Sequence, residues 1–123
     1  MKRVIAAATA TAVVATTAPA VVEPPTAAAT PPIVGSNGLT PNAWALAQYV
    51  RDTYPGVLSI GGVRADPLPD HPSGHAIDIM IGSNTALGDT ILADIQSQTA
   101  RFGIRYTLWR VPNHYDHIHV SVQ

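Results

Sequence analysis

The chain of 123 residues contains no cysteine. Disulfide bridges, thiolate zinc sites and a cysteine nucleophile are therefore excluded. Charge is also scarce, because charged residues make up only 12% of the sequence and no basic cluster stands out, which argues against a nucleic-acid partner. A small domain without disulfides needs another source of stability, and a bound metal ion is one candidate.

The first segment has the composition of a targeting sequence. Residues 1–3 form a basic head, and residues 4–19 are mainly Ala, Val and Thr without a charge. This pattern predicts a secretory signal peptide over residues 1–20, cleaved after Ala20. The alternative is a retained membrane anchor, but Thr and Ala are weak spanning residues. We expect secretion, with no stable membrane insertion after cleavage.

The next segment, residues 21–38, is rich in Pro, Ala and Thr and is interpreted as a linker. Residues 39–123 remain as one folded domain with a modest core. Five arginines and eight acidic residues remain after cleavage and give a net charge of −3. A monomer is expected.

Periodicity predicts an α+β domain in the order α-β-β-α-β-β. Thr40 and Pro41 are typical of a helix start, and Pro55-Gly56 of a helix end. The expected fold is a small, mostly antiparallel sheet with two helices packed on one side. The expected helices are 41–54 and 84–101, and the expected strands are 57–64, 76–81, 104–111 and 116–122.

Alternation within two strands predicts a polar site. Asp78 points away from the isoleucine face of strand 76–81, and His117 and His119 point away from the apolar face of strand 116–122. If both apolar faces share one core, these side chains meet on the opposite surface of the sheet. His71, on the loop before strand 76–81, can fold over the same surface.

Imidazoles and a carboxylate gathered in this way suit a divalent transition metal, with Zn²⁺ as the first choice. Three protein ligands with a fourth position open are typical of catalytic zinc sites, whereas structural sites use four protein ligands. An aspartate in a strand of isoleucines requires a metal or an arginine partner in any case, because an unpaired buried charge is costly.

The run from His71 to Asp78, HPSGHAID, matches the pattern H-x2-G-x-A-x-D of the LAS metallopeptidases. This group includes lysostaphin-like endopeptidases, D-Ala-D-Ala carboxypeptidases and hedgehog signalling domains. The chain most resembles the D-Ala-D-Ala carboxypeptidase branch, because the run from Asp116 to His119, DHIH, is similar to that branch's closing motif. The two motifs occur in the family's order. The resemblance implies a hedgehog-like or D-Ala-D-Ala-peptidase-like fold.

The resemblance also implies roles for individual residues. Arg64 corresponds to an arginine that steadies the substrate carbonyl and the developing oxyanion. Asp116 takes the place of the catalytic acid/base, and His117 that of an assisting histidine. The implied zinc ligands are His71, Asp78 and His119.

Together these features predict a secreted zinc metallopeptidase of the bacterial cell envelope. Its expected reaction is the hydrolysis of peptide bonds in peptidoglycan stem peptides, as in D-Ala-D-Ala carboxypeptidases. The alternative is a zinc-stabilised module that binds wall peptides or a protein partner without hydrolysis. The acid/base set, Asp116 and His117, favours the enzyme, because a binding module does not need it.

The chain departs from the family pattern at several positions. Pro69 stands where the family has a serine, and residues 65–67 after Arg64 lack the usual serine and downstream glutamine. These departures leave the bond specificity open. Two further histidines, His75 and His114, receive no ligand role.

Each assignment has a simpler alternative. His71 can be a solvated loop residue, and Asp116 can be a turn residue. Arg64 can merely pair with a nearby aspartate on the surface. His117 can stack on or hydrogen-bond a substrate without transferring a proton.

Overall fold

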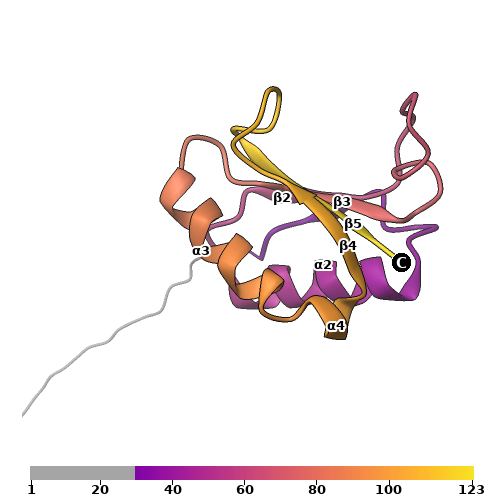
Figure 1. Ribbon diagram of the computed structural model, residues 1–123, viewed down its shortest axis with the longest axis horizontal. Coiled ribbons are helices and arrows are strands. Elements are labelled where there is room, and N and C mark those ends of the chain that lie inside the picture. Colours follow the sequence, from indigo (N-terminus) through magenta and orange to yellow (C-terminus); the bar gives the residue numbers. More distant parts are fainter. Residues whose placement is uncertain (1–29) are drawn as a thin grey trace, which may run out of the picture.

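The protein is described here by a computed structural model that places residues 30–123. The predicted signal peptide and most of the predicted linker lie outside these residues. Five strands and three helices form the described part of the chain, as Figure 1 shows. In chain order they are β1 (Ile33–Val34), α2 (Pro41–Thr53), β2 (Ser59–Gly61), β3 (Ala76–Met80), α3 (Thr85–Gln96), α4 (Thr99–Phe102), β4 (Ile104–Leu108) and β5 (His117–Val122).

The strands form one mixed sheet in the order β1-β2-β3-β5-β4. Only β1 and β2 are parallel, and every other neighbouring pair is antiparallel. All three helices lie on the same side of the sheet, and two long loops rise from the other side (Figure 1). The prediction of an α+β domain with a small, mostly antiparallel sheet is therefore confirmed.

The sheet has one strand that the sequence did not predict. Ile33 and Val34 lie in the segment interpreted as a linker, but they pair with Ile60 and Gly61 of β2. The following segment approaches closely, because a Cβ at Gly62 would lie 2.5 Å from the carbonyl oxygen of Gly35. The folded unit therefore begins before Leu39, and Gly62, just after β2, marks this close backbone approach.

The predicted helix 84–101 is two helices, so the count of two helices is wrong. α3 ends at Gln96, and the shorter α4 begins at Thr99. The hydroxyls of Ser97 and Thr99 donate to the carbonyls of Asp94 and Gln96. Such local bonds compete with the helical ladder, which explains the break.

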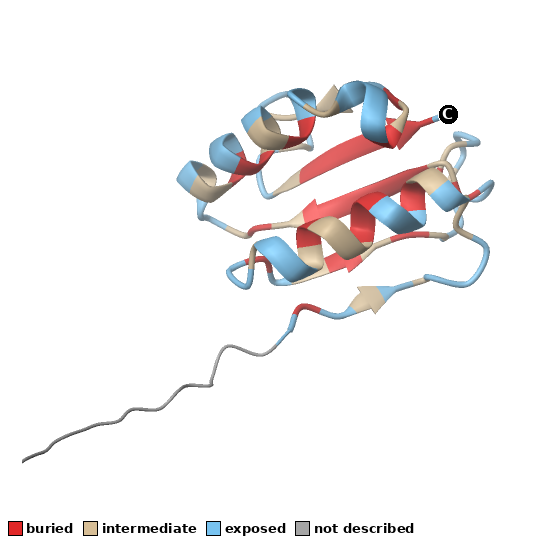
Figure 2. Cartoon of the chain, turned by 90° about the horizontal axis from the view of Figure 1, so that it is seen from below, coloured by how far each residue is buried: buried red, intermediate tan, exposed pale blue. Residues whose placement is uncertain are grey.

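The core lies between the sheet and the helices; Figure 2 shows buried residues in red along the strands and in parts of the helices in front of them. The isoleucine faces of β3 and β5 both belong to it, as the alternation predicted. In α2, Leu46 is fully buried against the sheet, whereas the side chain of Trp44 is 38% exposed.

The strands around the site are shorter than predicted. β2 covers only Ser59–Gly61, and β4 ends at Leu108. Arg110 has a left-handed backbone conformation, with φ of 58°, which interrupts a strand that was predicted to reach residue 111. The chain after Leu108 becomes a loop that overhangs the helix-free face. No helix within residues 30–123 is long and apolar enough to span a bilayer.

Candidate metal centre

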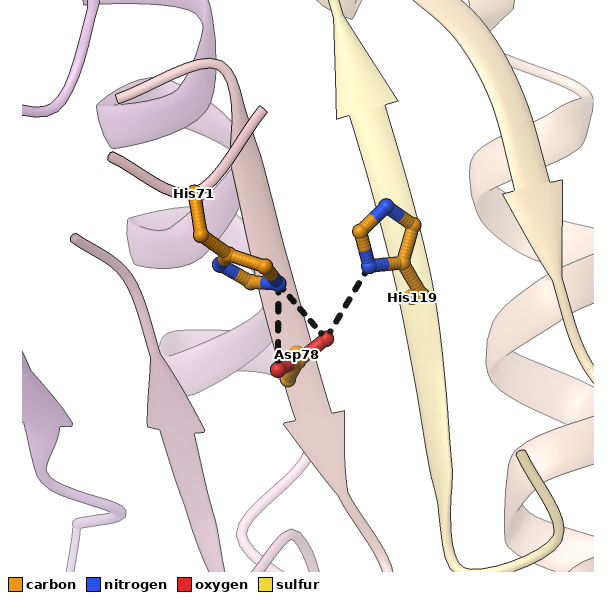
Figure 3. Close-up of side chains that lie close together, drawn as sticks. All are labelled: His71, Asp78 and His119. Carbon is orange, nitrogen blue, oxygen red and sulfur yellow. Dashed lines mark hydrogen bonds and ion pairs between the residues drawn. The ribbon is translucent and has the colours of Figure 1, made fainter. Parts of the chain in front are cut away.

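Neighbouring strands place two of the predicted ligands side by side. In the antiparallel register of β3 and β5, Asp78 is directly opposite His119. His71 comes from the loop between β2 and β3 and points to the same carboxylate (Figure 3). His71 Nε2 lies 3.2 Å from both oxygens of Asp78, and His119 Nδ1 lies 3.3 Å from Oδ1. The structure thus brings the three predicted ligands together in a buried cluster.

The loop that carries His71 is fixed by a glycine. Gly74 has φ of +81°, and a Cβ there would lie only 2.1 Å from the carbonyl oxygen of Gly38. Any other residue would therefore be both strained and in collision. The carbonyl of Gly74 accepts a hydrogen bond from Thr40 N, which joins the loop to the start of α2. The glycine of the motif thus has a backbone role.

The hydrogen bonds of His71 define which nitrogen faces Asp78. Its Nδ1–H donates to the carbonyl oxygen of Gly62 at 2.9 Å, and a carbonyl can only accept. In the neutral ring, Nε2 therefore carries a lone pair, and this lone pair faces the carboxylate. Two acceptors at this distance repel unless a proton or another cation lies between them.

The carboxylate of Asp78 is held in its charged form. Burial raises its pKa, but His119, His71, His117 and Arg64 outweigh burial and lower the pKa to about 2. The cluster therefore holds a negative charge that faces imidazole nitrogens. Protonating both rings would place two cations close together, since the ring centroids of His71 and His119 are 5.0 Å apart. A single divalent cation would take the place of both protons.

The donor set fits a transition metal. One ligand atom from each of the three residues lies within 4.8 Å of the other two. Zinc bonds to nitrogen and oxygen of about 2.0–2.1 Å in a tetrahedron correspond to a ligand–ligand separation of about 3.3 Å. The two separations that involve Asp78, 3.2 and 3.3 Å, are close to this value. This cluster can hold a metal ion.

A pocket of about 280 Å³ opens next to the cluster. The loop between β2 and β3, strand β4, the β4–β5 connection and strand β5 all contribute side chains to it. Arg64, His71, His117 and His119 are among them. A small substrate in this pocket would therefore contact two of the three candidate ligands.

The predicted acid/base residues lie at different depths. His117 lines the pocket, and its Nε2 is 3.8 Å from Asp78 Oδ1. Its Nδ1–H donates to the Asp116 carboxylate at 2.8 Å. The Asp116 side chain is 67% exposed and lies outside the pocket lining. The hydrogen bond to His117 lowers the pKa of Asp116, so this carboxylate is an ionised partner of the imidazole.

The predicted oxyanion residue, Arg64, also reaches the site. Its guanidinium donates to Asp78 Oδ2 at 3.2 Å and to Asp66 Oδ2 at 2.7 Å. The side chain is 48% exposed and lines the pocket. Arg64 therefore bonds a candidate ligand and keeps part of its positive surface available to a bound molecule.

Sequence reasoning missed several residues around the cluster. His114, which received no role, lines the pocket, and its ring centroid is 4.9 Å from that of His117. Asp70, Tyr106 and Ser121 form a hydrogen-bonded group beside His119. Ser121 lies on the same face of its strand as His119, and from this alternation its position beside His119 could have been predicted. Asp70 and Tyr106 offered no such signal, because their contacts depend on how the loop folds back.

Trp109 and His75 lie near the site but outside the pocket. Trp109 packs at the edge of the core and donates from Nε1 to Asp89. Gly88 allows this packing, since a Cβ there would lie 2.4 Å from the indole ring. His75 is half-buried and pairs with Ser73 at 2.8 Å. Neither Trp109 nor His75 contributes to the pocket.

Comparison with known proteins gives one match. The family model described as VldE, C-terminal domain, matches residues 35–115, which is more than half of the chain. The match includes His71 and Asp78 and ends just before Asp116. No curated protein and no solved structure matches the sequence.

Proposed function

The chain belongs to the VldE C-terminal domain family, and for this member we propose the function of a secreted zinc metallopeptidase that hydrolyses peptidoglycan stem peptides. The observation that carries the proposal is the convergence of His71, Asp78 and His119, with ring nitrogens turned toward an ionised carboxylate. A set of two imidazoles and one carboxylate leaves a coordination position for a reactant, as catalytic zinc sites do.

The choice of peptide hydrolysis rests on the groups around this cluster. Bound zinc supplies a Lewis acid that polarises a carbonyl and makes water more acidic. His117 is placed to move the proton: its Nδ1–H is bonded to Asp116, so Nε2 has the lone pair and faces the cluster. We assign to Nε2 the removal of the proton from the attacking water and its delivery to the leaving amine.

Asp116 orients this imidazole and stabilises its charged form, as a carboxylate partner does for a catalytic histidine. The predicted roles of Asp116 and His117 are therefore divided: the histidine exchanges the proton, and the aspartate holds the histidine. Arg64 places positive charge at the edge of the pocket, where it can bind the carbonyl oxygen as negative charge develops.

The resemblance of the two sequence motifs to LAS metallopeptidases supports both the ligand set and the substrate class. Each motif lies at the cluster, one on the loop leading into β3 and one on β5. The antiparallel strands β3, β5 and β4 with helices on one face are compatible with a hedgehog-like fold, which we include in the proposal. The proposed signal peptide would deliver the enzyme to the cell envelope, where these peptides occur.

A direct test uses the purified chain and muropeptides of defined sequence. Product release measured by mass spectrometry should stop on addition of a zinc chelator and return on addition of zinc. The Asp116→Asn variant should bind zinc like the wild type and lose most of its turnover. Binding of muropeptides without any product, with or without zinc, would contradict the enzymatic proposal.

One observation favours the second candidate, a non-catalytic zinc-stabilised module that binds wall peptides. The guanidinium of Arg64 is already engaged by Asp66 and Asp78, which reduces the charge that it offers to an oxyanion. Isothermal titration with the same muropeptides separates the candidates. Saturable, zinc-dependent binding without hydrolysis would favour the module over the enzyme.

A further inference from the structure

Ser121 is a fully buried polar residue on the helix-free face of the sheet. Its hydroxyl oxygen lies 2.9 Å from His119 Nε2 and 2.6 Å from Asp70 Oδ2. Asp70 is 51 positions away along the chain, on the loop that also carries His71. A line of hydrogen bonds therefore joins a candidate ligand to a carboxylate that is not itself a ligand.

The direction of each hydrogen bond follows from the carboxylate. Asp70 accepts hydrogen bonds from Ser121 and Tyr106, and an aspartate carboxylate at neutral pH can only accept. The Ser121 hydroxyl hydrogen is used on Asp70, and its oxygen is left to accept from His119 Nε2–H. This places the lone pair of His119 on Nδ1, which is the nitrogen 3.3 Å from Asp78.

Tyr106 secures the same arrangement from β4. Its ring stacks on the imidazole of His119, with centroids 5.8 Å apart and planes inclined by 22°. Its hydroxyl donates to the oxygen of Asp70 that also binds Ser121. Asp70 thus binds both Ser121, which is hydrogen-bonded to the ring of His119, and Tyr106, which stacks on that ring.

We propose that Asp70 and Ser121 are positioning residues that hold His119 as the Nε2–H tautomer, so that Nδ1 is presented to the metal. The proposal rests on the metal centre of His71, Asp78 and His119, and it does not depend on the reaction performed there. The two histidines then bind by different nitrogens, because the Gly62 carbonyl leaves Nε2 free in His71, whereas Ser121 leaves Nδ1 free in His119.

The expected effect is on affinity for the ion. Hydrogen-bond partners of a ligating histidine fix its tautomer and raise its basicity, and their loss typically weakens metal binding about 10–100-fold. The adjacency of Asp70 and His71 adds a second effect, because the bond from Ser121 also ties the loop of His71 to β5.

The experiment measures zinc affinity, by competition with a chelating indicator, and the nitrogen of His119 that keeps its proton, by the ¹⁵N chemical shifts of its ring in the zinc-loaded chain. Ser121→Ala and Asp70→Asn should each weaken zinc binding about 10–100-fold and make His119 a mixture of both tautomers. Ser121→Thr, which keeps a hydroxyl, should restore both properties. Ser97→Ala, a matched loss of one hydroxyl far from the site, should change neither.

Zinc affinity within twofold of the wild type in Ser121→Ala, with His119 still entirely in the Nε2–H form, would overturn the proposal. Asp70→Asn decides the question if Ser121→Ala does not fold, because it preserves the side-chain shape. Failure of the wild-type chain to bind zinc would overturn the metal centre and this proposal with it, whereas the outcomes for the His119 ring overturn the positioning role alone. A wild-type His119 with its proton on Nδ1 would overturn the positioning role independently.

Discussion

The two faces of the sheet are built from the same strands but meet opposite requirements. On the helix-covered face, Ile77 and Ile79 of β3 are fully buried beneath helices and need only close packing. On the other face, Asp78 of the same strand is 7% exposed and is surrounded by imidazoles and a guanidinium. Residues of β3 that point toward the helices therefore build the core, and the residue between them, Asp78, belongs to the candidate site.

The contrast lies in what each face requires. Buried methyl groups need only contact, whereas the Asp78 carboxylate needs charged or hydrogen-bonding partners, and the proposed cation would be shared by Asp78 and two imidazoles. The apolar face therefore depends on packing alone, whereas under the proposal the polar face would be completed by a bound ion. Substitutions on the two faces should differ in kind as well as in size.

The largest expected effect comes from removing the central carboxylate. Asp78→Ala should abolish measurable zinc binding, because two histidines remain and lose the charge that they share. Zinc should likewise fail to raise its melting temperature, whereas at 100 times the dissociation constant the wild type should gain about 2.7 kcal/mol. Calorimetry with and without zinc measures both. Equal zinc stabilisation of the two proteins would show that the ion binds elsewhere.

The next effect concerns turnover rather than binding. His117→Ala should lower kcat by about 100- to 10,000-fold, which is the usual contribution of general acid–base catalysis. Zinc affinity should change little, since His117 is not one of the three ligands. The comparison variant is His75→Ala, a histidine outside the pocket, which should keep its activity. Full activity in His117→Ala would show that His117 does not transfer the proton.

On the apolar face, Ile79→Ala should reduce stability by about 2–5 kcal/mol, as expected for a large-to-small change in a packed core. Denaturant unfolding in excess chelator measures this effect without a contribution from zinc. Asp78→Ala under the same conditions should cost less, because it leaves the packing of the isoleucine face unchanged. A larger loss for Asp78→Ala than for Ile79→Ala would contradict the division between the faces.

The smallest effect tests a carboxylate that needs no ion. Burial raises the pKa of Asp94, but hydrogen bonds from Tyr49, Tyr54 and Gln98 outweigh burial and leave it below 3.8. The folded-state pKa is lowered, so this stabilisation is present above pH 3.8 and is lost as the pH falls through the folded value. Asp94→Asn should therefore cost about 1 kcal/mol near neutral pH and progressively less in acid.

Urea unfolding of both proteins in chelator, at pH values on either side of 3.8, measures the difference. A gap that grows as the pH falls would mean that Asp94 is not stabilised in its charged form.

Many residues on both faces of the sheet could be assigned from the local sequence pattern. Alternation in β3 and β5 correctly separated the isoleucines from Asp78, His117 and His119, because a strand exposes successive residues on opposite sides. The spacing of His71, Gly74 and Asp78 in one motif indicated the cluster. Strand alternation and motif spacing both involve residues close together in the sequence. They remain readable in a small domain, because each strand has only one buried apolar face.

Other features depended on contacts that no local pattern records. β1 has only two residues, and it forms because the chain beyond Val34 runs close to Gly62. The break after Gln96 depends on hydroxyl bonds to particular carbonyls. Asp70 reaches Ser121 only through the path of a proline-rich loop. Contacts between residues that are far apart in the sequence cannot be predicted from the periodicity of apolar residues.

The central claim is tested most directly by locating the ion. Anomalous X-ray scattering at the zinc edge, from crystals of the chain grown with zinc, should show one ion about 2.0–2.2 Å from its ligand atoms. The predicted atoms are His71 Nε2, His119 Nδ1 and one oxygen of Asp78. Peaks only elsewhere on the protein, or no peak between β3 and β5 in excess zinc, would contradict the account.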